Sequence, residues 1–372
     1  MYVEDNVEGD AHQDQGHEIR QEEGLDNQED EAADTPLYPN SKTHTKLYIT
    51  VELYMQKTVS GISRKDFDEL LKTIASLLPP GHCLPKSTYE VKKLLKSYQL
   101  THQKIHACEN DCCLFRKKLK DADECPKCHY SRWKQDTSNM EDDTYMIDKP
   151  KKEISVKVLR YIPIVPRLKR LYQSAELAEQ LIWHATNKSK DGKIRHPSDS
   201  LAWKHIDRRF PAFASDSHNL HLGLAVDGFN PFGDLSATHS CWPVMIVVNN
   251  LSPKMCMQDD NIILSMLIPG KKQPGKNIDV YLQPLIDDLI ELWEKGVKVY
   301  DSFSKTEFNL KDLLMWTIND FPAHGNLSGY TYKGKEAYPL CGENTLSNWL
   351  SFSHKTIYMN HRRFLHHNPP LR

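Results

Sequence analysis

LHLGLAVD, residues 220–227, is the clearest strand signal in this sequence. Leucine or valine fills every second position, and a period of two predicts a half-buried β-strand. Two further apolar runs, 243–248 and 262–268, are each closed by turn residues and predict two more strands. Three consecutive strands of this kind can form an antiparallel meander.

A helix and a fourth strand are predicted next. Apolar residues recur at helical spacing from Ile278 until Gly296 ends the pattern. Pro284 lies inside this pattern and predicts a kink, or the point where the regular part begins. The run 313–318 is the fourth strand, and Asp320 closes it. A helix of this length can carry the chain across the sheet, so that the fourth strand lies parallel to the first and beside it.

Asp227 closes the first strand and Asp320 closes the fourth. If these strands are parallel neighbours, the two carboxylates converge at one edge of the sheet. This is the arrangement of an RNase H-like fold, an α/β fold with a mixed sheet, whose paired acids hold Mg²⁺ or Mn²⁺ for phosphoryl transfer. A third acid usually completes such a site, and the strand order does not identify it. The alternative is that each aspartate only forms a turn or caps a helix.

Charge is divided unevenly along the 372 residues. Residues 1–34 hold 13 acidic residues and one basic residue, Arg20, for a net charge of −12. The remainder holds 47 basic and 37 acidic residues, for a net charge of +10. A basic body favours a polyanionic partner. The acidic N-terminus does not have the pattern of a secretory signal, and no apolar run is long enough to span a membrane, so we expect a soluble chain.

The pattern divides the chain into five parts. We expect a disordered acidic tail at 1–40, because its composition cannot bury enough apolar surface to fold. A helical module at 41–104 and a zinc-binding module at 105–134 follow. A basic linker with helices spans 135–215. The RNase H-like core spans 216–372 and is expected to be incomplete at its C-terminus.

Five of the nine cysteines lie between residues 108 and 128. Cys108 and Cys112 form one close pair, and twelve residues separate Cys112 from a second pair, Cys125 and Cys128. This spacing predicts a structural Zn²⁺ site of the ribbon type, with four thiolate ligands. Cys113 is an alternative to Cys112, and His106 or His129 is an alternative to one thiolate. The other interpretation is a set of reduced, buried cysteines.

A basic stretch spans residues 149–171, and Pro163 and Pro166 within it argue against one continuous helix. It predicts contacts to DNA phosphates, or else an ordinary solvated face beside a core segment. The residues predicted to contact DNA are Lys151, Lys152, Lys157, Arg160, Arg167, Lys169 and Arg170. A second group, in which metal binding competes with an incidental grouping, contains Cys341, His354, His361, His366 and His367.

Long ordered stretches of the chain resemble the transposases of CACTA-type (Enhancer/Suppressor-mutator) DNA transposons, mostly from plants. The resemblance covers roughly residues 84–365. Its stretches include LPKSTYEVKKLL (84–95), KIHACENDCCLF (104–115), CPKCHYSRWK (125–134), DGKIRHPSDSLAWKHID (191–207), LGLAVDGFNPFG (222–233) and WTINDFPAHGNLSG (316–329).

The resemblance implies a nuclear, cut-and-paste transposase with an RNase H-like core and a three-acid site. Asp227 and Asp320 take the places of the first two acids. The implied partners are DNA at the transposon ends, with a second copy of the chain or a second transposon-encoded protein. Relatives usually show Cys-Pro-x-Cys where this chain has Tyr338-Pro339-Leu340-Cys341.

The third acid is expected beyond Arg372, and nothing in the context of Glu336 or Glu343 recommends either. Two hypotheses follow. One is a transposase, or a fragment of one, that cleaves and joins DNA strands with Mg²⁺ at the two aspartates. The other is a non-catalytic remnant that binds DNA or protein.

Overall fold

A computed structural model describes residues 35–41, 44–98, 102–134, 154–189, 191–230, 239–270, 272–330, 334–337 and 341–359. The chain divides into two compact units, residues 1–101 and 102–372. Each unit is described by itself. Of the acidic tail predicted at 1–40, residues 1–34 lie outside the described residues, and so do residues 149–153 of the basic stretch.

The first unit contains three helices, α2 (Lys46–Val59), α3 (Arg64–Leu77) and α4 (Thr88–Ser97). Each begins at a hydroxyl residue, because the side chains of Thr45, Ser63 and Ser87 accept a hydrogen bond from an N–H of the first turn. The helices enclose a small core made of Leu37, Phe67, Leu71, Leu84 and Val91.

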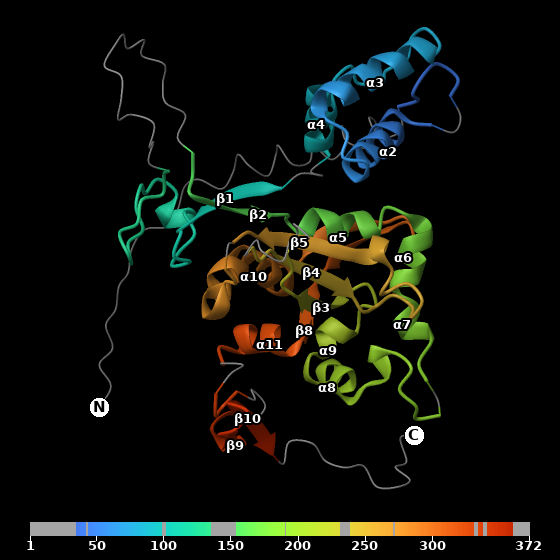
Figure 1. The fold of residues 1–372 in the computed structure, drawn as a ribbon. Helices are drawn as coiled ribbons and strands as arrows, with labels where there is room; N and C mark the ends of the chain where they lie inside the picture. The colour runs from blue at the N-terminus through green and yellow to red at the C-terminus, as the bar shows by residue number, and fades with distance from the viewer. Residues whose placement is uncertain are drawn as a thin grey trace, which may run out of the picture. The chain divides into compact units, whose positions relative to one another are not determined.

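The second unit is built on a six-stranded sheet in the order β1-β2-β5-β4-β3-β8 (Figure 1). The central strands are β3 (Leu220–Val226), β4 (Trp242–Val248) and β5 (Ile262–Ile268). They pair antiparallel in sequence order, and β8 (Asp312–Asn319) pairs parallel with β3. The predicted meander and the predicted parallel fourth strand are both confirmed.

The helix predicted between the third and fourth strands is α10 (Ile278–Glu294), with Pro284 inside it. The sequence pattern missed a hairpin after this helix, formed by β6 (Val297–Asp301) and β7 (Thr306–Leu310). It also missed that β1 (Gln103–Ala107) and β2 (Lys157–Tyr161) extend the sheet. The basic stretch thus contains a strand followed by a short helix, and it is not one continuous helix, as its prolines indicated.

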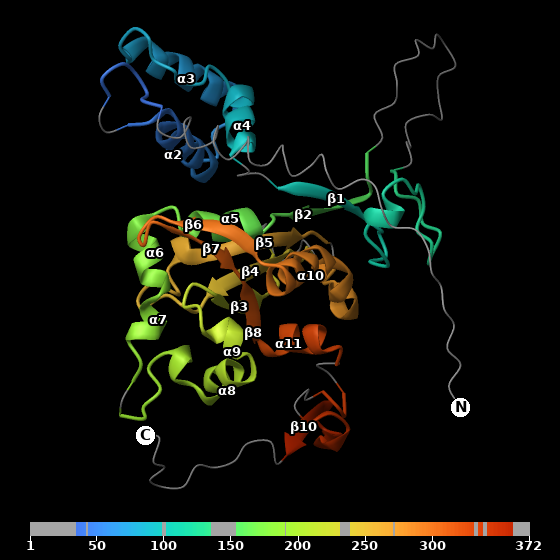
Figure 2. The ribbon, with the colours of Figure 1, turned by 180° about the vertical axis from the view of Figure 1, so that it is seen from behind.

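Helices cover the sheet on both sides of this unit. Figures 1 and 2 show α6 and α7 along one side and α10 and α11 along the other. The remaining helices are α5 (Val165–Leu171), α6 (Ala175–Leu181), α7 (Trp183–Thr186), α8 (Leu201–Arg209), α9 (Pro211–Ala214) and α11 (Phe321–Ser328). The short 3₁₀ turns lie at Lys117–Leu119, Pro197–Asp199, Asp259–Asn261, Gly275–Asn277 and Gly342–Asn344.

The core of the second unit is formed by the sheet together with α5, α6 and α10. Leu220, Leu222, Leu224 and Val226 of β3 are buried in it, together with Leu285 of α10. A separate exposed hairpin, β9 (Leu346–Leu350) and β10 (Lys355–Met359), comes after the sheet. None of the helices in the described residues has the length and apolar character needed to cross a membrane.

Candidate functional sites: a carboxylate pair and a cysteine cluster

The parallel pairing of β3 with β8 sets where the two predicted acids lie. Val226 is the last residue of β3, and its register partner is Asn319, the last residue of β8. The side-chain oxygen of Asn319 also accepts a hydrogen bond from the Val226 N–H, at 3.2 Å. Asp227 and Asp320 are the next residues in each strand, so both follow a paired position at the same end of the sheet.

Both carboxylates are exposed, and each uses one oxygen to fix the backbone that follows it. Oδ1 of Asp227 accepts from the Gly228 N–H at 2.7 Å. Oδ1 of Asp320 accepts from the Ala323 N–H at 2.8 Å and so caps α11. Within the described residues neither Oδ2 atom has a hydrogen bond, so each aspartate keeps an oxygen without a partner there. The structural interpretation of these aspartates is thus compatible with a role in metal binding.

A tight turn follows Asp227. A Cβ atom built on Gly228 would lie 2.6 Å from the Trp242 ring, which is closer than real Cβ atoms approach. Phe229 and Cys241 then exchange both backbone hydrogen bonds, at 2.8 and 2.9 Å. The glycine in this motif therefore lets the chain turn closely over Trp242 directly after the aspartate.

A third acid is not brought to these two by the described residues. Glu336 and Glu343 are both exposed, and neither joins a group of potential metal ligands. Asp312 is buried, but it begins β8 and so lies at the end opposite to Asp320. Burial, and then the neighbouring Asp288, raise the pKa of Asp312 well above its ordinary value. Sequence pattern gave no sign that this acid is buried.

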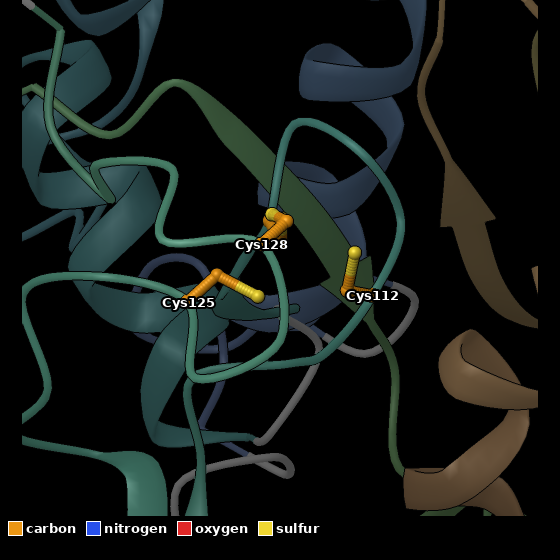
Figure 3. Close-up of side chains that lie close together, drawn as sticks. Cys112, Cys125 and Cys128 are labelled. Atoms are coloured by element: carbon orange, nitrogen blue, oxygen red, sulfur yellow. The ribbon is translucent and has the colours of Figure 1, made fainter.

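The four predicted cysteines come together. The sulfur atoms of Cys108, Cys112, Cys125 and Cys128 all lie within 4.8 Å of one another. Figure 3 shows three of them on two loops that face a common space. Four thiolates at about 2.3 Å from a tetrahedral ion lie about 3.8 Å apart, so the cluster fits a structural zinc ion. This is the one group of three or more potential metal ligands found in the described residues.

The alternatives to these ligands also have defined places. Cys113 is buried, and its sulfur lies 3.7 Å from the sulfur of Cys125. His106 points elsewhere, because its Nδ1 pairs with Nε of Arg132 at 2.8 Å. His129 is exposed, and its Nδ1 lies 3.7 Å from Glu124. The geometry therefore selects the four cysteines of the original spacing.

Local hydrogen bonds prepare two of the thiols to ionise. The Asn110 side chain, donating to its sulfur, lowers the pKa of Cys128 to about 6. Burial raises the pKa of Cys125, but the N–H groups of Cys128 and Lys127 outweigh it and the pKa is lowered. Burial raises the pKa of Cys108 to about 12. A divalent cation would offset this effect, because thiolates rather than thiols are its ligands.

The cysteine loops are attached to the rest of the unit by polar contacts that sequence reasoning missed. Asp111 accepts hydrogen bonds from Lys157 of β2 and from the hydroxyl of Tyr281 in α10. Asp287, also in α10, lies 2.6 Å from Arg116 and 2.7 Å from Lys117. These contacts hold the loops against α10.

The residues predicted to contact DNA divide into three groups. Lys151 and Lys152 lie outside the described residues. Lys157 is half-buried and paired with Asp111, and Arg167 is half-buried with a pKa that burial lowers. Arg160 is exposed on β2, while Lys169 and Arg170 are half-buried in α5. Exposure to solvent is therefore greatest at Arg160.

The second predicted Cys/His group lies only partly within the described residues. Cys341 is half-buried and His354 is exposed, and neither joins a group of metal ligands in the described residues. His361, His366 and His367 lie outside those residues.

A buried cluster of aromatic rings at the other end of β3 was not predicted. His221 stacks on Trp203 of α8 with ring centroids 3.6 Å apart. His184 lies beside both, at 5.3 Å from Trp203 and 5.9 Å from His221. His196 bonds the backbone oxygen of Leu251 through Nε2 at 2.9 Å. The motif at 191–207 therefore supplies rings that pack on the sheet.

A match to a known protein family covers the part of the chain that contains the two aspartates. Residues 191–372 match the family model described as transposase family tnp2. The matched range contains β3, β8 and both aspartates, whereas the cysteine cluster lies before it. No curated protein matches the chain. The family match supports a transposase and, with it, DNA as the partner.

Proposed function

We propose that this protein is a DNA transposase of the CACTA type that cleaves and joins DNA strands in cut-and-paste transposition. The observation that carries the proposal is the Val226–Asn319 register pair, which puts Asp227 and Asp320 at one end of adjacent parallel strands. The order of β3, β4, β5 and β8 in the sheet is that expected of an RNase H-like core. The family match over the same residues supports this assignment.

In this proposal the two aspartates hold Mg²⁺ or Mn²⁺, which prefers carboxylate oxygens and leaves positions for water and substrate phosphates. Such an ion supplies stabilisation of the attacking and leaving oxygens during phosphoryl transfer. The protein's own part is to fix the two side chains. Asp320 is fixed by capping α11, and Asp227 by the turn at Gly228. Both keep a free oxygen at an exposed edge, where a DNA backbone can approach.

The cysteine cluster has a structural part in the proposal. A zinc ion with four thiolates has no open position for a substrate. It would hold the two cysteine loops together beside β1 and present their lysines to DNA. We also propose that the protein acts in the nucleus at transposon ends, with a second copy or another transposon-encoded protein. The charge of +10 over residues 35–372 suits a DNA partner.

The test is cleavage of a labelled transposon-end duplex by the full chain with Mg²⁺ or Mn²⁺. We expect Asp227→Asn and Asp320→Asn each to abolish cleavage, because each removes a carboxylate charge at nearly constant shape. Asp279→Asn is the matched control, since Asp279 is exposed on α10. Cleavage that survives both substitutions would remove the proposed site. Titration with Mn²⁺ gives a second readout, because binding must fail in the same two variants.

A non-catalytic DNA-binding remnant is the second candidate. One observation favours this candidate: within the described residues no third carboxylate lies with Asp227 and Asp320. This candidate predicts DNA binding that is unchanged by Asp227→Asn and Asp320→Asn and is lost when zinc is removed. Metal-dependent strand cleavage by purified chain would decide against it.

A further inference from the structure

Helix α4 of the first unit carries an exposed stripe of one aromatic and three basic side chains. Tyr89, Lys92, Lys93 and Lys96 are all exposed, and Tyr89 is 67% accessible. Their spacing of i, i+3, i+4 and i+7 puts them on one helix face, within an arc of about 100°. The four residues are called the α4 stripe below.

The opposite face of α4 is already in use. Thr88 and Val91 are 2% and 1% exposed, and Val91 belongs to the core of the unit. Asp68 of α3 accepts hydrogen bonds from the N–H and the hydroxyl of Thr88, at 2.5 and 2.6 Å. These contacts fix which face of the helix points outward. A basic amphipathic helix can bind a membrane surface, but here the apolar face is not available to lipid.

The charges of the α4 stripe are not neutralised within the described residues. Lys92, Lys93 and Lys96 have no hydrogen bond or ion pair there. The acid on α4 is Glu90, and its carboxylate accepts from the Lys86 N–H at 2.7 Å in a capping arrangement. Residues 44–98 as a whole carry nine basic and five acidic residues. The stripe is therefore a preoriented cationic surface that lacks an anion of its own.

We propose that the α4 stripe binds duplex DNA, with its lysines on backbone phosphates and Tyr89 at the edge of the contact. The partner is identified by charge complementarity and by size. An α-helix with its side chains is about 10–12 Å across, so α4 matches the major groove, which is about 12 Å wide. This inference rests on the proposed function, because it supplies that function with a DNA-holding surface in a unit outside residues 191–372.

The experiment measures the affinity of the full chain for a transposon-end duplex over a range of salt concentrations. The variant Lys92→Gln/Lys93→Gln/Lys96→Gln removes three charges and keeps good helix formers in place. The matched control is Arg64→Gln/Lys65→Gln/Lys72→Gln, which removes three exposed charges from α3. Circular dichroism must show that both variants keep the helix content of the parent.

We expect the α4 variant to bind roughly tenfold more weakly and to reduce the salt slope by about 2 to 3, one for each lost phosphate contact. Tyr89→Ala should weaken binding with little change in slope. The α3 control should behave like the parent. An equal loss in both triple variants would overturn the assignment to α4, and so would unchanged binding in the α4 variant.

The cleavage assay separates this inference from the proposed function. If the α4 variant binds normally and the parent still cleaves DNA, the inference fails and the function stands. If the parent neither binds nor cleaves the duplex, both fail. Affinity for an acidic protein that depends on the α4 stripe, without affinity for DNA, would overturn the inference in favour of a protein partner.

Discussion

Lowering the pH from 7 to 5 should destabilise the second unit through two buried histidines. His184 and His221 are 5% and 3% exposed. Burial lowers the pKa of His184 to about 4 and that of His221 to about 3, from an ordinary value of 6.5. Positive charge on His196 and Lys188 lowers the pKa of His184 further. Positive charge on His184 and Lys188 does the same for His221. The folded state therefore keeps both rings neutral at pH 5.

The direction and size of the change in unfolding free energy follow from the difference in proton binding between the unfolded and the folded chain. Below pH 6.5 the unfolded chain binds a proton at each histidine and the folded chain does not, so stability falls as the pH falls toward the folded pKa values. One pKa unit corresponds to about 1.4 kcal/mol. Each histidine then lowers the free energy of unfolding by about 2 kcal/mol between pH 7 and pH 5. This loss of unfolding free energy depends little on the two pKa values in the folded chain, since both lie below 5.

The assay is urea unfolding followed by tryptophan fluorescence at pH 7, 6 and 5. All seven tryptophans lie after residue 101, so the signal reports on the second unit. His221→Phe keeps a flat ring against Trp203 and cannot titrate. We expect its pH-dependent loss to be smaller than that of the parent by about 2 kcal/mol. His205→Gln, which removes an exposed histidine of α8, is the control and should match the parent.

Two neighbours of His221 would favour its protonated form and so oppose the effect of burial. A carboxylate oxygen of Asp207 lies 3.6 Å from Nε2, and burial raises the pKa of that acid. The face of Trp203 would also attract an imidazolium. If the folded protein takes up a proton at His221 with the help of these groups, the parent and His221→Phe will lose stability in parallel. That outcome would show that the ring is not held neutral.

The remaining predictions concern the two candidate metal sites. Cys125→Ser should reduce bound zinc from about one ion per chain to none and speed hydrogen exchange in the cysteine loops, whereas Cys341→Ser, outside the cluster, should retain the ion. Unchanged zinc content in Cys125→Ser would contradict the ligand set. Asp320→Ala should lower the free energy of unfolding by about 1 kcal/mol through loss of the α11 cap, while Asp320→Asn should cost only a few tenths because asparagine also caps. Equal losses in the two variants would show that the cap does not matter.

The strand order could be predicted because its signals are long and regular. β3, β4 and β5 each have seven residues with apolar side chains at most positions, and α10 has a full helical repeat. The parallel pairing of β8 then follows from the handedness and length of the connection. This is why the placement of Asp227 and Asp320 could be predicted without a structure. Both lie directly after residues whose pairing the topology dictates.

The missed elements are short or mixed in polarity. β1 reads QKIHA and β2 reads KVLRY, so charged residues occupy strand positions that a pattern search assigns to a basic surface. The β6–β7 hairpin has five-residue strands, and it follows Gly296, which ends the helical pattern with φ at +72°. Such strands are identified by their partners rather than by their own sequence.

The choice of ligands within the cysteine cluster needed geometry as well as spacing. Cys112 and Cys113 are adjacent, and the sequence allowed either to complete the site. In the structure Cys112 joins the other three sulfurs, whereas Cys113 is buried against Cys125 and packs in the small core of the loops. Backbone direction at the turn decides this, including the positive φ of Asp111 at +59°. Spacing alone does not carry that information.

The two candidate metal sites should depend on each other only weakly. The cysteine loops follow β1, which reaches the central strands through β2, and β2 pairs with β5 at only two residues, Arg160 and Tyr161. The strands that end directly before Asp227 and Asp320 instead pair over seven positions and share the main core. Loss of zinc should therefore loosen the loops and their contacts with α10 while the carboxylate end of the sheet stays folded. Under the proposed function, loss of zinc would then disturb how DNA is held and would leave Asp227 and Asp320 in place.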